Sequence, residues 1–353
     1  MKMKNSAVAA ILGVGMLSVP TFAHSDGFKD KLDNIQISGF VDTSLFSSNV
    51  KNANGTTTRG FGLDQVELDI EFHEGNVGLR FDLNASPSAG GNVTQDGLFE
   101  QGYLTYTIPS VADDGLTFTF GKFNAPIGWE LLDAPDMYQF SHALVFNYGL
   151  PTNLTGVMAS AKYSIFDLSA YLTNGTDVNG TQANGMKTYG GRLGVTPVEG
   201  VNVGFSYVVD KNRNNIITLG NPASTIADVD LTIDAIENLV IGAEYNETKG
   251  FQNDATVAYV GPAIKSRGYM VMAHYDFTEM FGATARYDVF DFDRAATGRS
   301  TAYTGAITAS LGGGLGALIE VRSDKNSAVA TDANGTPADK TVRTYAFEMT
   351  YAF

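Results

Sequence analysis

The side chains in this sequence that could do chemistry are charged groups spread along alternating segments and a group of acids in one long connection. Glu130, Asp133 and Asp136 lie in the connection 124–153. Opposed acidic and basic walls around water create a transverse field, which screens solutes by charge and size. The sequence therefore predicts a pore constriction made by these acids together with further residues on its wall: Arg80, Lys122, Arg192, Arg286, Glu320 and Arg322.

A simpler interpretation of the same residues stays open. Charges that point into a barrel can solvate its wall and pair with their neighbours without touching a solute. The connection 124–153 can also lie outside as a flap instead of folding inward. It is the longest predicted connection, and long connections without their own secondary structure are often functional. We therefore expect it to fold into the lumen.

Other kinds of site lack the residues they need. The chain has no Cys, so thiolate catalysis, disulfides and Cys-ligated metals are excluded. Its four His share no metal-ligand spacing, and no cofactor is predicted. The glycine-rich stretch 312–317 fits a dinucleotide pattern, but an alternating segment follows it instead of a helix, so it predicts a turn. No nucleophile motif accompanies His274, and we predict no catalytic residue.

The charged residues are positioned by segments in which apolar and polar residues alternate. The pattern is clear in 65–73, 77–84, 201–209, 228–234, 268–277 and 283–289. In the last nine residues, aromatic and apolar side chains at every second position end on Phe353. Period-2 alternation indicates strands with a different solvent on each face. An aromatic-rich final strand ending in Phe is typical of bacterial outer-membrane barrels.

Connections between these segments alternate in length. Short ones lie near 73–76, 109–115, 164–167, 196–200, 234–238, 277–280 and 312–314. Long ones lie near 47–60, 86–97, 124–153, 174–186, 210–227, 246–266, 291–300 and 324–340. This asymmetry is typical of outer-membrane barrels, whose short turns are periplasmic and whose long loops are extracellular. The sequence predicts an all-β, transmembrane, antiparallel up-and-down barrel of sixteen strands, with fourteen or eighteen as alternatives.

The membrane requires this barrel to be closed, because hydrocarbon offers no partner to an open strand edge. Sixteen strands enclose a space too wide for side chains to fill, which leaves an aqueous channel. The predicted barrel occupies 24–353. Residues 1–23 are a cleaved signal peptide, with Lys2 and Lys4 before a short apolar run and a small-x-small site ending at Ala23. That run is well short of the roughly 20 residues a membrane-spanning helix needs.

The amino-acid composition restricts the classes of partner that this protein can have. Charged residues make up 17% of the chain, below the roughly 25% usual for soluble domains. The formal net charge is −15, which argues against nucleic acid or anionic lipid as the main partner. An acidic chain predicts a mild preference for cations.

Several short motifs resemble the OmpL-like β-barrel porin family and, more distantly, the phosphate-selective porins. They are Gly121-Lys122-Phe123, Gly128, Glu130, Ser141, Pro151, Gly156, Tyr163, Asn174-Gly175, Arg286-Tyr287-Asp288 and the run 320–324. Val321 departs from the family, which has an aromatic residue there. The resemblance implies a general or weakly selective diffusion pore in the bacterial outer membrane. Its expected surroundings are membrane lipid, lipopolysaccharide and small hydrophilic solutes, and its expected assembly is a homotrimer.

Three functional hypotheses follow. The first is a porin that lets small hydrophilic solutes or ions diffuse passively. The second is a surface adhesin or receptor that acts through the loops of the same barrel. The third is a barrel hydrolase that uses His274.

Overall fold

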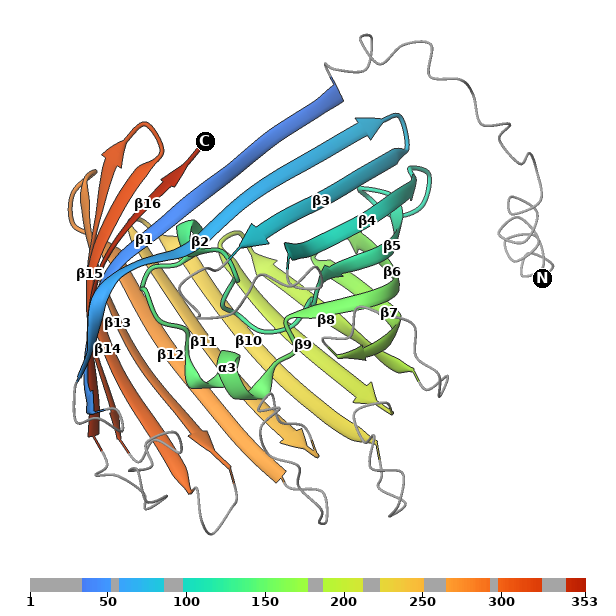
Figure 1. Cartoon of the computed structure of the whole chain (residues 1–353). Coiled ribbons are helices and arrows are strands. Elements are labelled where there is room, and N and C mark those ends of the chain that lie inside the picture. Colours follow the sequence, from blue (N-terminus) through green and yellow to red (C-terminus); the bar gives the residue numbers. More distant parts are fainter. Residues whose placement is uncertain are drawn as a thin grey trace, which may run out of the picture. The chain divides into compact units, whose positions relative to one another are not determined.

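Sixteen antiparallel strands close into one barrel in the computed structural model of the chain (Figure 1). The structure describes residues 34–51, 57–85, 98–176, 187–211, 223–250, 265–292, 298–325 and 341–353. Neighbours in sequence are neighbours in the sheet, and β1 pairs with β16. The predicted architecture and strand number are confirmed. The strands are β1 (Ile35–Lys51), β2 (Thr57–Glu74), β3 (Val77–Ala85), β4 (Phe99–Ile108), β5 (Leu116–Asn124), β6 (Asn153–Tyr163), β7 (Phe166–Thr176), β8 (Thr188–Val198), β9 (Val201–Asp210), β10 (Ser224–Ile236), β11 (Leu239–Lys249), β12 (Lys265–Asp276), β13 (Phe281–Asp291), β14 (Arg299–Gly312), β15 (Leu315–Lys325) and β16 (Thr341–Ala352).

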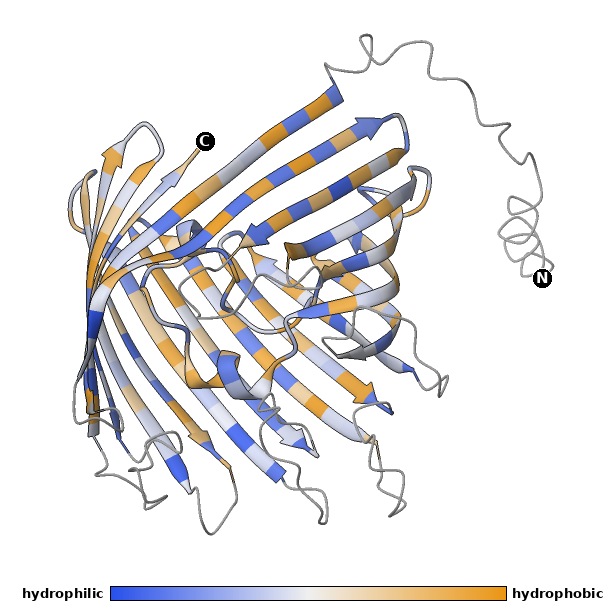
Figure 2. Ribbon diagram, in the orientation of Figure 1, coloured by the Kyte–Doolittle hydropathy of each residue, from blue (hydrophilic) through white to orange (hydrophobic). Residues whose placement is uncertain are grey.

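Alternation along each strand sorts side chains between the two faces of the wall. Val271 and Phe347 are exposed on the outer face, whereas Glu244 and Arg286 are buried on the inner face. Figure 2 shows the resulting bands of hydrophobic and hydrophilic residues along the strands. An apolar outer face is what the hydrocarbon of a bilayer requires of a membrane-spanning barrel.

The two ends of the chain seal the barrel. Leu45 of β1 lies opposite Phe347 of β16 in an antiparallel ladder. At the end of this ladder, the Phe353 amide donates to the Gly39 carbonyl at 3.0 Å, and the Gly39 amide donates to the Phe353 carbonyl at 3.3 Å. The aromatic C-terminal strand is therefore a full member of the wall, and the pairing removes the open edge that hydrocarbon would not tolerate.

Short turns join the strands at one rim. They follow β2, β4, β6, β8, β10, β12 and β14, as the sequence predicts. Five of them have two residues, and a residue with positive φ lies in each, such as Gly75 at 60° and Asn238 at 62°. Ser164 has φ 54°, so the turn after β6 forms without Gly or Pro. Polar residues such as Ser and Asn reach this region at lower cost than most side chains.

The first predicted long loop is shorter than expected. β1 continues to Lys51 and β2 starts at Thr57, so strand occupies most of 47–60. The pattern is hard to read there because Ser, Asn and Thr dominate both faces. The middles of the other long loops except 124–153, and the predicted signal peptide 1–23, lie outside the described residues. Among the described residues, none of the helices has the length and hydrophobicity needed to span a membrane.

Candidate functional site: a loop bound to the inner wall

The connection between β5 and β6 lies against the inner face of strands distant in sequence. It contains the 3₁₀ helix η3 (Ala134–Asp136) and the short helix α3 (Leu144–Gly149). α3 contacts β11, β12, β13 and β14, and η3 contacts β16. We call 124–153 the lumen loop. Its backbone runs inside the ring of strands (Figure 1).

Trp129 binds the lumen loop to β10 and β11. Its indole Nε1 donates to Thr232 Oγ1 at 3.0 Å, and its backbone amide donates to Glu244 Oε2 at 3.0 Å. The ring lies over Gly242, where an added Cβ would come within 2.3 Å of Trp129 Cε2. A side chain at this inward position would therefore displace the indole.

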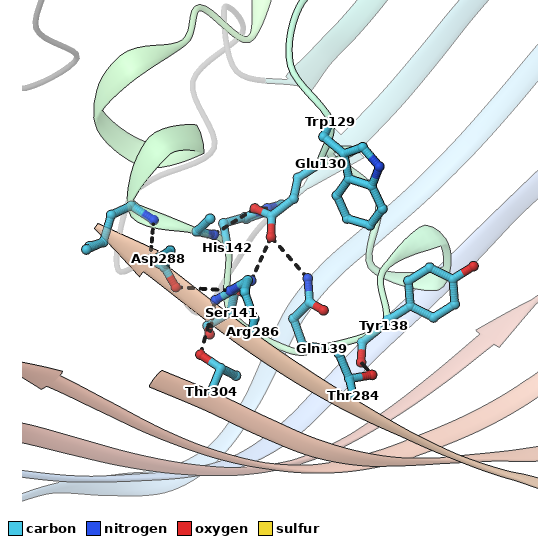
Figure 3. Close-up of polar contacts among 12 residues, drawn as sticks. Trp129, Glu130, Tyr138, Gln139, Ser141, His142, Thr284, Arg286, Asp288 and Thr304 are labelled. Carbon is cyan, nitrogen blue, oxygen red and sulfur yellow. Dashed lines mark hydrogen bonds and ion pairs between the residues drawn. The ribbon is translucent and has the colours of Figure 1, made fainter. Parts of the chain in front are cut away.

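Glu130 and Arg286 form a buried ion pair at the centre of the site (Figure 3). Arg286 Nη1 lies 2.6 Å from Glu130 Oε1, and the two side chains are 0% and 1% exposed. Glu130 also accepts hydrogen bonds from the Ala143 amide at 2.7 Å and from Gln139 Nε2 at 3.1 Å. Burial alone would raise the pKa of Glu130, but the positive charge of Arg286 and the contact with His142 lower it below its usual value. The carboxylate is thus held ionised.

Charged wall residues also bind the backbone of the lumen loop. Arg286 donates to the Ser141 carbonyl at 2.5 Å, and Arg322 donates to the His142 carbonyl at 2.5 Å. Glu320 accepts from the Ser141 amide at 3.0 Å. Asp288 Oδ1 accepts from the Leu144 amide at 2.8 Å. Three of the residues singled out from the sequence, Arg286, Glu320 and Arg322, therefore meet around Ser141 and hold the loop in place.

An apolar contact completes the attachment and has no counterpart among the residues singled out from the sequence. Val145 and Leu150 of the lumen loop pack with Met270 and Met272 of β12, and all four are buried. Gly268 leaves room for Val145, whose Cγ2 would lie 2.8 Å from an added Cβ. The signal was present in the sequence: β12 is apolar on both faces over 269–273, which is the pattern of a strand covered on both sides.

Arg80 and Arg192 point inward but bind neighbours on the wall. Arg80 Nε lies 2.8 Å from Asp82 Oδ1, and its guanidinium also pairs with Glu71. Arg192 of β8 pairs with Asp230 of β10 on the inner face, over the intervening β9. For these two residues, the structure matches the simpler interpretation of inward charges paired with their neighbours.

Lys122 does not point into the lumen, and its placement there was wrong. It alternates with the buried Phe123 and shares the face of Phe120, which is 68% exposed. Its Nζ donates to the Phe99 carbonyl at 2.6 Å at the long-loop end of β5. The period of two puts it on the outer face.

Asp133 and Asp136 lie at η3, where the lumen loop reaches the β2 side of the barrel. The Ala134 amide donates to Gln65 Oε1 of β2 at 3.4 Å. Burial, together with the negative charges of Glu100 and Asp136, raises the pKa of Asp133 to about 7. Asp133 is therefore near an acidic part of the wall and not opposite the basic one.

A closed sixteen-stranded barrel with an apolar outer face, a charged inner face and an internal loop defines a transmembrane diffusion channel. The sequence matches the family described as "Putative beta-barrel porin-2, OmpL-like" over residues 34–353. The chain belongs to this porin family. It is a channel of the bacterial outer membrane through which solutes diffuse passively.

Solved structures with the same fold are porins. One is an anion-selective porin from Comamonas acidovorans, 14% identical, with a TM-score of 0.62 over 90% of this chain and 99% of that chain. Another is the outer-membrane channel DcaP of Acinetobacter baumannii, 12% identical, with a TM-score of 0.63 over 90% and 97%. A third is Salmonella typhi OmpF in complex with daunomycin, 14% identical, with a TM-score of 0.63 over 90% and 97%. At these identities the likeness shows the fold alone. A search of the curated proteins found no match.

Proposed function

We propose that the lumen loop forms the constriction of this channel and that the channel prefers small hydrophilic cations. The observation that carries the preference is an imbalance of charge on the inner wall. Arg80, Arg192, Arg286 and Arg322 are each bound to carboxylates. By contrast, several buried acids form no ion pair with Lys or Arg among the described residues: Asp42, Glu67, Asp228, Glu244, Glu320 and Glu348.

This imbalance acts on solutes through the field in the lumen. A wall with excess carboxylate raises the local concentration of cations, and low-dielectric surroundings strengthen the effect. A hollow of about 370 Å³ is lined by Pro126 of the lumen loop and by Lys162, Asp167 and Arg192 of the wall. It is the kind of space beside the loop that a hydrated solute needs. The Comamonas acidovorans porin is described as anion-selective. The shared fold by itself therefore does not decide whether a channel prefers cations or anions.

Reversal potential across a planar bilayer under a KCl gradient tests the preference. The refolded chain should give stable conductance steps and a potential of the sign expected for cations. Replacing one of these wall acids, Glu320→Gln, should lower the preference. Glu247→Gln is the matched control, because it removes the same kind of charge from the outer face. A potential of the anion sign would overturn the proposal, and an equal effect of the control would show that lumen charge is not the cause.

We propose no enzymatic role, and His274 supports this. Its ring stacks on Tyr138 at 4.3 Å between centroids, and Nδ1 and Nε2 lie 2.8 Å from Thr284 Oγ1 and 3.1 Å from Asp276 Oδ1. Thr284 in turn donates to the Tyr138 carbonyl at 2.8 Å. These contacts assign His274 to holding the lumen loop. Hydrolysis of an ester or peptide substrate that is abolished by His274→Ala would contradict this assignment.

Lipopolysaccharide is the surrounding lipid that the outer rim fits best. Lys265, Arg267 and Arg299 lie on the outer face at the long-loop ends of β12 and β14. Arg299 donates to the Tyr269 hydroxyl at 2.6 Å, which fixes the guanidinium just beyond an aromatic residue. Aromatic girdles mark the membrane interface in such barrels. Cationic side chains just beyond such a girdle lie where they can bind the phosphate groups of lipopolysaccharide. The double substitution Arg267→Gln with Arg299→Gln should therefore weaken binding of purified lipopolysaccharide more than binding of its dephosphorylated form.

A homotrimer is the assembly we propose. One solved structure of OmpT from Vibrio cholerae is described as a trimer form and aligns with a TM-score of 0.59 at 14% identity. Native mass spectrometry of the refolded protein in detergent gives the mass directly. A monomer under conditions that preserve channel activity would refute the trimer.

A further inference from the structure

Three carboxylates from separate parts of the chain converge inside the barrel. They belong to Glu67 of β2, Glu100 of β4 and Asp133 of the lumen loop, and one oxygen of each lies within 4.8 Å of the others. Glu67 also belongs to a second such group, with Asp69 and Asp82 on the wall. We call Glu67, Glu100 and Asp133 the carboxylate triad. It joins the loop to β2 and β4, whereas the Glu130–Arg286 pair joins the loop to β13.

The buried member of the triad has an oxygen without a hydrogen-bond partner among the described residues. Glu67 is only 2% exposed, and its Oε1 has no hydrogen-bond partner in the part of the chain that the structure describes. Its other oxygen accepts from Asn84 Nδ2 at 2.6 Å. Asp133 Oδ1 likewise has no partner among the described residues. Burying a carboxylate oxygen without a donor or a cation is costly, so these two atoms favour binding of a positively charged ligand.

The protein's own cations do not supply that charge. Arg80 lies on β3, between β2 and β4, and it pairs with Glu71, Asp69 and Asp82. Within the described ranges, no Lys or Arg forms an ion pair with any member of the triad. The neutral amides of Asn84 and Asn124 donate to Glu100 at 2.6 and 3.2 Å, which orients this carboxylate without neutralising it.

We propose that the carboxylate triad binds a divalent cation, Ca²⁺, that links the lumen loop to β2 and β4. Ca²⁺ takes six to eight oxygen ligands in flexible geometry, and carboxylates are its usual protein ligands. Mg²⁺ demands near-ideal octahedral geometry and keeps most of its water, which suits a site shared by a loop and a wall less well. The unsatisfied oxygens of Glu67 and Asp133 are the first two ligands, Glu100 is the third, and water completes the shell.

The surroundings of Asp133 support this assignment. Burial and the charges of Glu100 and Asp136 raise the pKa of Asp133 to about 7, which is the response of a carboxyl group to negative neighbours that nothing neutralises. A cation between these groups would remove the repulsion. It would also fasten the part of the lumen loop that contains η3.

Bound Ca²⁺ has two effects that the ion preference proposed above does not include. It ties the tip of the lumen loop to the wall, so the constriction becomes steadier. It also removes negative charge from the lumen, so cation preference falls as Ca²⁺ rises. Neither effect requires the empty channel to be cation-selective, because binding itself is measured on the protein in detergent.

Calorimetric titration of the refolded full chain with CaCl₂, after treatment with EDTA, tests the site. We expect saturable binding of one Ca²⁺ that weakens at least about tenfold in Glu67→Gln and in Asp133→Asn, because even an indirect loss at a metal site commonly has that effect. Asp136→Asn is the matched control: it removes an acid from the same 3₁₀ helix but outside the triad, and should keep binding. Heat-modified migration in gels verifies that each variant forms a barrel.

The other outcomes overturn the proposal. No saturable binding by the wild-type chain means that the triad holds protons or water instead of a metal. Binding that survives both triad substitutions places the cation elsewhere. An equal loss in Asp136→Asn shows general attraction to the acidic lumen and not a site. Reversal potentials measured in EDTA decide the ion preference separately, so failure of either proposal leaves the other standing.

Discussion

Trp129 fills the space over Gly242: a Cβ added to Gly242 would come within 2.3 Å of Cε2 and 2.5 Å of Cζ2 of the indole. The two residues lie on the lumen loop and on β11, and the indole is also hydrogen-bonded to Thr232 on the neighbouring strand. Trp129 is the single tryptophan of the chain. Its fluorescence therefore reports whether the lumen loop is packed against the wall.

Gly242→Ala should displace the indole and loosen the lumen loop. Overpacking of this kind typically costs about 1–3 kcal/mol. We expect a red shift of tryptophan emission and easier quenching by iodide, without loss of the barrel. Gly305→Ala is the control, because no atom lies within 4 Å of a Cβ at that position on β14. An unchanged spectrum in Gly242→Ala would mean that the indole does not rest on this glycine in solution.

Glu130→Ala should release the centre of the lumen loop. It leaves the fully buried side chain of Arg286 without its carboxylate partner on the loop, although Asp288 and the Ser141 carbonyl still bind it. Breaking a buried pair commonly costs about 3–5 kcal/mol, and we expect a cost at the lower end because these contacts remain. Single-channel records should show larger and noisier conductance. Glu247→Gln removes an acid from an ion pair on the outer face, and should leave the records unchanged because exposed pairs contribute little. If the conductance of Glu130→Ala is as small and as quiet as that of the wild-type protein, the Glu130–Arg286 pair does not hold the constriction.

Packing of the loop tip should weaken as pH rises in calcium-free buffer. The pKa of Asp133 is about 7 in the packed loop and near 3.8 when the carboxyl is surrounded by water. The packed state therefore binds the proton more tightly, and packing is most favourable below the lower value and is progressively lost up to about pH 7. Current noise recorded from about pH 5 to about pH 8 should increase, and Asp133→Asn should flatten this dependence. Current noise that decreases as pH rises would contradict the prediction that ionisation of Asp133 weakens packing of the loop.

Leu231→Arg should destabilise the barrel. Leu231 lies between Val203 and Ala243 on neighbouring strands, on the outer face. An Arg near the middle of the bilayer costs about 2–4 kcal/mol. Reversible unfolding in lipid vesicles measures this, with Leu231→Phe as the neutral control. A negligible change in the Arg variant would remove Leu231 from the lipid face.

The faces of individual strands were readable wherever only one face is apolar. Arg286 lies between Ala285 and Tyr287, and Arg322 follows Val321 in an alternating segment, so their inward direction followed from the sequence. β5 is different. Phe118 and Phe120 on one face and Phe123 on the other are all aromatic, because the inner face of this strand is covered by the lumen loop. Alternation then does not distinguish the inner face of the strand from the outer face, and Lys122 was assigned to the wrong face.

The sequence by itself determined the barrel, its closure and the rim that carries the short turns, and it favoured sixteen strands over fourteen or eighteen. Those properties depend on a period of two and on turn chemistry, which are local. The tertiary structure alone decided which charges meet, because Glu130 and Arg286 are 156 residues apart and nothing local relates them. It also separated the acids of the lumen loop, placing Glu130 against a guanidinium and Asp133 against Glu67 and Glu100. The physical reason is that the path of a loop across a lumen is set by contacts with strands from distant parts of the chain, and no periodicity records it.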